Sequence, residues 1–240
     1  MPGEYDSDDD YKYKFVLNTP NLQELKYKEV APEIYSVNKL NACVKADISF
    51  FQGDGRVHDG SMEKLAIAEF VERICRVQWL YLSDNLMQFY RFPLPKFDHL
   101  TYLELGYHRT VQWKMLLDFV QSSPRLETLI FGGLAKEGNQ TTSRWYQLEH
   151  IPSCLLFHLK IIEIKQFSAD SHELKMAEYF LNNSRVLEKL IIHPVCLPDW
   201  GKLEICEKVL MLPRRSRTCR VEVLPEMDDE DEDDIFVPDP

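Results

Sequence analysis

The chain has 240 residues, of which 45% are hydrophobic, and its formal net charge at pH 7 is -11. This length is sufficient for a sizeable core in one elongated domain or in two fused ones. The first thirty residues carry charges in place of an apolar stretch, and no run of about 18 apolar residues occurs. We therefore expect neither a signal peptide nor a membrane span, and a protein of the cytoplasm or the nucleus.

The negative charge lies mainly at the two ends of the chain. Residues 228–234 are seven consecutive acids, five more acids lie within residues 4–10, and Asp239 is also acidic. Without them the remaining chain is close to neutral. Runs of like charge repel each other and stay solvated, so we predict disordered acidic ends at residues 1–12 and 225–240.

The cysteines favour a structural role. The six of them form no Cys-x-x-Cys motif and no cluster with histidine at zinc spacing. Such cysteines are typically small buried hydrophobic residues of a reducing compartment. We therefore expect no metal site and no other cofactor.

A six-residue pattern recurs along the chain: apolar, two variable, apolar, one variable, apolar. Complete copies begin at Leu22, Val77, Leu100, Leu126, Leu159 and Leu187, and a weaker copy begins at Cys43. The copies start 21 to 34 residues apart, a spacing that brackets the leucine-rich-repeat period. Each copy predicts one short strand, and parallel stacking of such strands gives a solenoid with an extended binding face.

Helical patterns alternate with these strands. The predicted helices and the last strand cover residues 62–75, 111–121, 171–181, 202–210 and 219–223. Residues 52–60 form an Asp-Gly-rich loop, and residues 132–147 form the longest polar insertion. Alternation of strand and helix with short connections predicts a parallel sheet whose helices lie on the convex side.

A second pattern begins near residue 151. It comprises residues 151–156, 162–164, 173–181 and 186–190, and it closes with residues 212–221. The pattern resembles the FBD domain of plant F-box/leucine-rich-repeat proteins over about residues 145–223, and upstream segments such as 123–129 resemble the repeats of the same family. The predicted fold is therefore an α/β leucine-rich-repeat solenoid, with repeats over residues 13–144 and an FBD segment over residues 145–224 as its C-terminal cap.

The resemblance implies a protein-recognition function. Members of this family normally begin with an F-box, which docks a Skp-type adaptor of a cullin ubiquitin ligase. In this chain the acidic N-terminus is followed directly by repeat-like sequence, so we expect no F-box and no adaptor binding. The implied function is recognition of a protein or peptide substrate. A sequestering adaptor or decoy, and a truncated product without function, remain as alternatives.

Alternation along each strand predicts which side chains face a partner on the concave side. The candidate partner-binding residues are Trp79, Tyr81, Tyr102, Glu104, Ile130, Ile161, Glu163, Lys165, Lys189 and Ile191. We expect the three aromatic residues to be the anchors. The three isoleucines are expected to share one register, forming an apolar ladder that a partner or a loop covers. His193 is expected to be a surface contact on the same side.

Two further clusters suggest other functions. Asp54 and His58 are the best acid–base pair, which leaves a hydrolase as an alternative, although Asp-Gly turns explain the same residues. No nucleotide-binding glycine motif and no Gly-x-Ser-x-Gly elbow occur, so we predict no enzyme. The arginines at 214, 215, 217 and 220 are weak grounds for nucleic-acid binding. A solvated corner or a dock for the acidic tail explains them as well.

Overall fold

The computed structural model describes residues 14–30, 34–37, 40–51, 68–83, 93–106, 112–133, 150–195 and 199–225. The strands are β1 (Lys14–Leu17), β2 (Glu24–Val30), β3 (Ile34–Val37), β4 (Lys45–Phe51), β5 (Trp79–Leu82), β6 (Tyr102–Leu105), β7 (Thr128–Phe131), β8 (Ile161–Phe167), β9 (Lys189–Pro194) and β10 (Arg220–Val223). The helices are α3 (Trp113–Ser122), α4 (Ser153–Phe157), α5 (Ser171–Asn183) and α6 (Asp199–Leu210).

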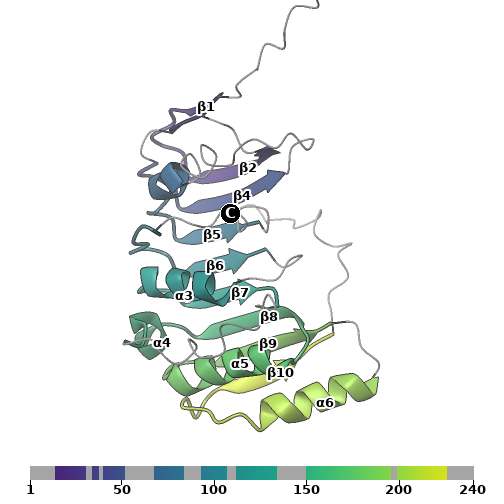
Figure 1. Cartoon of the computed structure of the whole chain (residues 1–240). Coiled ribbons are helices and arrows are strands. Elements are labelled where there is room, and N and C mark those ends of the chain that lie inside the picture. Colours follow the sequence, from purple (N-terminus) through teal and green to yellow (C-terminus); the bar gives the residue numbers. More distant parts are fainter. Residues whose placement is uncertain are drawn as a thin grey trace, which may run out of the picture.

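Eight of the strands form one parallel sheet. Their order is β10-β9-β8-β7-β6-β5-β4-β2, so strands that follow each other among these eight are neighbours in space. Figure 1 shows this stack, with the helices α3, α4 and α5 in front of the sheet. A separate two-stranded parallel sheet pairs β1 with β3. These features confirm the predicted α/β class and its large parallel sheet, which fits a leucine-rich-repeat architecture.

The core follows the repeat pattern. The second and third apolar positions of every copy are at most 6% exposed: Leu25, Tyr27, Ala46, Ile48, Leu80, Leu82, Leu103, Leu105, Leu129, Phe131, Ile162, Ile164, Leu190 and Ile192. Burial of one such leucine or isoleucine stabilises the fold by about 1.5–3 kcal/mol. The predicted inward direction of these positions is therefore confirmed.

One backbone arrangement recurs where each strand begins. The carbonyl of Gln78 accepts hydrogen bonds from the N–H groups of Thr101 and Tyr102, at 2.9 and 3.0 Å. The carbonyl of Thr101 accepts in the same way from Glu127 and Thr128, at 2.8 and 2.9 Å. Each strand is thus aligned with the one before it at its first residue, which keeps the repeats in register although their lengths differ.

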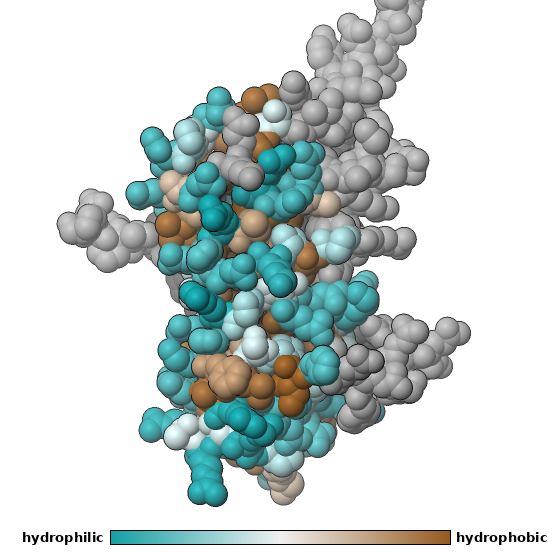
Figure 2. All heavy atoms as spheres, turned by 90° about the vertical axis from the view of Figure 1, so that its left-hand side faces the viewer, coloured by the Kyte–Doolittle hydropathy of each residue, from teal (hydrophilic) through white to brown (hydrophobic). Residues whose placement is uncertain are grey.

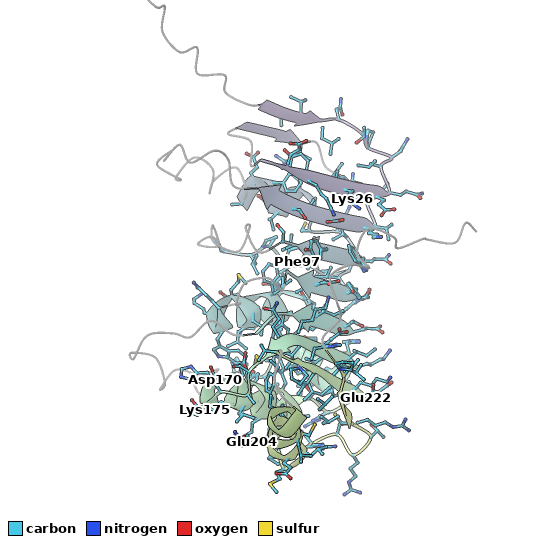
Figure 3. All side chains as sticks on the ribbon, turned by 90° about the vertical axis from the view of Figure 1, so that its right-hand side faces the viewer. Lys26, Phe97, Asp170, Lys175, Glu204 and Glu222 are labelled. Carbon is cyan, nitrogen blue, oxygen red and sulfur yellow. The ribbon has the colours of Figure 1, made fainter. Side chains whose placement is uncertain are left out.

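The helices cover one face of the sheet. α3 buries Leu116, Phe119 and Val120, and the ring of Phe97 stacks on Phe119 with 6.1 Å between centroids. Figure 3 places Phe97 between the strands and the helices, with Asp170 and Lys175 on the helical side and Lys26 on the opposite side. The helix predicted at 62–75 is confirmed for residues 68–73, and its first part lies outside the described residues.

Some predictions could not be compared with the structure. Both acidic ends, the loop with Asp54 and His58, and most of the polar insertion at 132–147 lie outside the described residues. The predicted boundary between residues 144 and 145 falls between β7 and β8, which pair with each other in the large sheet. Within the part of the chain that the structure describes, no helix is long and apolar enough to cross a membrane.

Candidate functional site

The sheet face opposite the helices carries two rows of side chains, and we call it the open face. The strand pairing places residues of successive strands side by side. The first row is Glu24, Lys45, Trp79, Tyr102, Thr128, Ile161, Lys189 and Arg220. The second row is Lys26, Asp47, Tyr81, Glu104, Ile130, Glu163, Ile191 and Glu222. The open face is the side that the sequence predicts to be concave.

The first row contains an aromatic stack. The rings of Trp79 and Tyr102 lie on the neighbouring strands β5 and β6, with 5.1 Å between centroids and 12° between planes. On the other side of the indole, Lys45 Nζ lies 4.7 Å from the ring centroid. Offset stacking and cation–π contacts each contribute about 0.5–1.5 kcal/mol. The three side chains therefore hold one another in place on the open face.

The stack is connected to a polar network in the middle of the sheet. The Tyr102 hydroxyl donates to Glu104 Oε2 at 2.8 Å, and Lys165 Nζ donates to Glu104 Oε1 at 3.2 Å. The Glu104 and Lys165 side chains are only 14% and 20% exposed. Burial, and then the adjacent Glu104 carboxylate, raise the pKa of Tyr102. The phenol therefore stays a neutral donor, and this network fixes the orientation of the Tyr102 ring.

The predicted isoleucine ladder is wrong. Ile161 lies in the first row, between Thr128 and Lys189, whereas Ile130 and Ile191 lie in the second row on either side of Glu163. The three side chains thus do not form a continuous line. Each isoleucine is instead next to charged or polar neighbours, and Ile130 is only 8% exposed.

His193 is also not the surface contact that the sequence suggested. It is 5% exposed, because both ring nitrogens face protein atoms. Nε2 lies 3.0 Å from Glu163 Oε1, and Nδ1 lies 2.9 Å from the carbonyl oxygen of Pro225. The imidazole therefore connects β8 and β9 to the chain as it leaves β10.

Asp47 of the second row has an unusual environment. Its side chain is 17% exposed, and Lys26 Nζ lies 3.9 Å from Oδ2. The other oxygen, Oδ1, is buried without a hydrogen bond from any described residue. Burial raises the pKa of Asp47, and the lysines at 28, 26 and 45 oppose this effect only in part. The ionised carboxylate is therefore held at a cost to folding.

We expect the Asp47→Asn variant to change how folding stability depends on pH. Because the folded protein holds the Asp47 proton more tightly than the unfolded chain, stability falls as the pH rises from the ordinary value of 3.8 through the raised pKa. Asparagine removes this loss, so the variant should gain stability relative to wild type across that window. Urea denaturation at several pH values measures it, with Glu24→Gln, an exposed acid of the same face, as control.

The remaining clusters that the sequence singled out differ in what the structure describes of them. Among the described residues, no group of three or more His, Cys, Asp or Glu side chains is placed to hold a metal ion. Asp54 and His58 lie outside these residues. In the arginine cluster, Arg214 donates to the carbonyls of Cys219 and Leu210, at 3.2 and 3.4 Å. Arg214 therefore closes the end of α6.

Comparison with known proteins extends these findings. The profile of the FBD family matches residues 147–192, the segment from α4 to β9. An F-box/LRR-repeat protein of Arabidopsis thaliana is 29% identical over 231 residues, which is 90% of this chain and 49% of that protein. The resemblance to plant F-box/FBD/leucine-rich-repeat proteins is confirmed.

Further Arabidopsis thaliana relatives also have names that contain the word F-box. An F-box protein is 29% identical over 86% of this chain and 47% of its own length. An FBD-associated F-box protein is 28% identical over 87% of this chain and 47% of its own length. The chain thus spans about half the length of the curated relatives that it matches. No solved structure matches the chain at comparable significance.

The FBD pattern consists largely of residues that the fold needs. Cys154 is fully buried, and its thiol contacts the carbonyl oxygen of Val120 at 3.3 Å. Ser216 of the closing motif donates its hydroxyl to the carbonyl oxygen of Leu187 at 2.6 Å. The FBD resemblance therefore reflects packing within the C-terminal part of the fold. Lys45 is not among the predicted partner-binding residues, although alternation along β4 places its side chain on the open face.

Proposed function

We propose that this chain is a protein-recognition module. It would be a leucine-rich-repeat solenoid over residues 13–144, with the FBD segment of residues 145–224 as its C-terminal cap and acidic segments at both ends. A protein or peptide would dock on the open face, in the cytoplasm or the nucleus. The names of the relatives suggest the substrate-binding role of an SCF-type ubiquitin-ligase receptor.

The stack of Lys45, Trp79 and Tyr102 supports this proposal most directly. Tryptophan, tyrosine and arginine dominate binding energies at protein interfaces, and rigid rings lose little conformational entropy when they bind. The face around the stack is balanced between acids and lysines that already pair with one another, such as Lys45 with Glu24 at 3.1 Å. A partner would therefore gain most of its affinity from the aromatic rings and much of its orientation from the charges.

Affinity capture from plant extract tests the proposal. The tagged chain is compared with a Trp79→Ala/Tyr102→Ala variant and with Phe157→Ala. Phe157 is a matched control because it is a 62% exposed aromatic residue on α4, away from the open face. Figure 2 shows the side on which the strands begin, where α4 lies, as mainly hydrophilic with an apolar area in its lower half. We expect proteins that the wild type and Phe157→Ala retain and the double variant loses.

The composition of the captured set decides between the two forms of the proposal. A Skp-type adaptor and a cullin retained by all three proteins would support a role inside a ubiquitin ligase. A partner that depends on the aromatic stack, captured without these subunits, would support a sequestering adaptor. If the double variant captures the same proteins as wild type, the open face is not the recognition surface.

A further inference from the structure

Among the described strands, β10 is the last one of the large sheet. β10 pairs with β9 on one side and with no described strand on the other. The N–H groups of Arg220 and Leu224 bond to carbonyls of Glu188 and Ile192, at 2.8 and 2.9 Å. Since N–H and C=O groups alternate in direction along a strand, those of Val221 and Val223 point outward. An edge of this kind can accept another strand.

Exposed apolar side chains lie on and after α6, the helix that Figure 1 shows beside β10. Leu203 and Leu210, seven residues apart and hence on one face of α6, are 61% and 54% exposed, and Met211 after the helix is 83% exposed. Val221 and Val223 are only half-buried, whereas the equivalent residues of β9 are fully buried. Terminal repeats of soluble solenoids normally present a polar outer face. The apolar character of this end indicates that something covers it.

The charged side chains of β10, Arg220 and Glu222, are complementary to those of a second copy of the strand. Arg220 and Glu222 project on the open face, and Arg220 makes no ion pair with any described residue. Glu222 lies 3.4 Å from Lys189 of β9. If two β10 strands pair antiparallel about Val221, Arg220 of each copy stands opposite Glu222 of the other. The outward groups of Val221 make the hydrogen bonds in this register, and positions 220 and 222 become non-hydrogen-bonded pairs, where side chains are closest.

We propose that the β10 edge is a dimer interface whose occupant is a second copy of this chain. The two-fold axis passes through Val221, and the two sheets join into one continuous sheet. Figure 1 places α6 beside β10 at the end of the stack, and in Figure 3 Glu204 of α6 and Glu222 of β10 lie at this same end. Both open faces point the same way.

Charge reversal tests this interface with analytical ultracentrifugation of the full chain. We expect a concentration-dependent dimer for wild type. In Arg220→Glu or Glu222→Arg alone, like charges face each other twice, so the dissociation constant should rise about tenfold or more. When the two variants are mixed in equal amounts, every charge again faces its opposite. The mixture should therefore dimerise as tightly as wild type.

The mixing step distinguishes loss of the interface from misfolding of a variant, because the dimer can re-form only if both variants are folded. A wild-type chain that sediments as a monomer at all concentrations would overturn the proposal and leave the edge to another occupant. A mixture that stays monomeric while wild type dimerises would also overturn it, since the dimer would then use a different surface.

Discussion

Replacing Trp79 with alanine should weaken binding of a captured partner by at least about 2 kcal/mol, which is roughly 30-fold in the dissociation constant. Trp79 lies at the centre of the stack, between Lys45 Nζ at 4.7 Å and the Tyr102 ring at 5.1 Å. The substitution removes the largest ring of the open face and also releases both neighbours. Isothermal titration calorimetry with the purified partner measures the loss.

The fold of this variant should remain intact. Trp79 is half-buried on the open face, whereas the core positions of β5, Leu80 and Leu82, are fully buried and unchanged. Trp79→Phe keeps a ring in the stack and should bind more tightly than Trp79→Ala. Lys45→Ala removes the cation–π contact and the exposed ion pair with Glu24, and it should cost no more than about 1 kcal/mol. Equal affinity of wild type and Trp79→Ala would exclude the stack as the anchor.

The side of the sheet to which each side chain points could be predicted, because it depends only on the residue's position along its own strand. In an extended strand successive side chains alternate, so the spacing of Leu80 and Leu82 fixes Trp79 and Tyr81 on the opposite face. The same argument placed Tyr102 and Glu104 correctly on β6. The six-residue apolar pattern therefore predicts both the core residues and the residues of the candidate surface.

The isoleucine ladder failed although the repeat pattern already contains the alignment of neighbouring strands. Counted from Leu126 and Leu159, Thr128 is equivalent to Ile161, and Ile130 is equivalent to Glu163. Backbone hydrogen bonds, such as those of Lys160 and Ile161 to the carbonyl oxygen of Glu127, hold this register and put Ile161 beside Thr128. Tertiary contacts also bury His193 between Glu163 and Pro225, and no local pattern around residue 193 indicates them.

Short elements without periodicity were missed for a related reason. β3 has four residues and α4 has five, too few for an apolar period to be recognised. At the end of β8 the pairing with β9 shifts between Ile164 and Phe167, and Gln166 has a φ of 55°. A non-glycine residue in this conformation is uncommon, and here it turns the backbone toward the loop that follows β7.

Glu173 is the residue that secures this irregular region. It is 2% exposed at the start of α5, and Oε2 accepts hydrogen bonds from the backbone N–H and the hydroxyl of Ser168, at 2.7 and 2.8 Å. A Cβ atom on Gly133 would lie 2.6 Å from Glu173 Oε1 and 2.8 Å from the carbonyl oxygen of Gln166. The absence of a side chain at Gly133 thus allows the loop to approach both the carboxylate and the bulge.

We expect Glu173→Ala to lower the free energy of unfolding by about 3 kcal/mol, because the two charged hydrogen bonds from Ser168 are lost. Gly133→Ala should cost about 1–3 kcal/mol through overpacking. The double variant should cost less than the sum, since the alanine at 173 removes one of the two close contacts. Urea denaturation measures all three. Glu178 is a half-buried acid on the same helix and has no hydrogen bond or ion pair with any described residue. Glu178→Ala is therefore the matched control and should stay within about 0.5 kcal/mol of wild type. If the control loses as much as Glu173→Ala, the effect belongs to α5 as a whole and not to the contacts of Glu173.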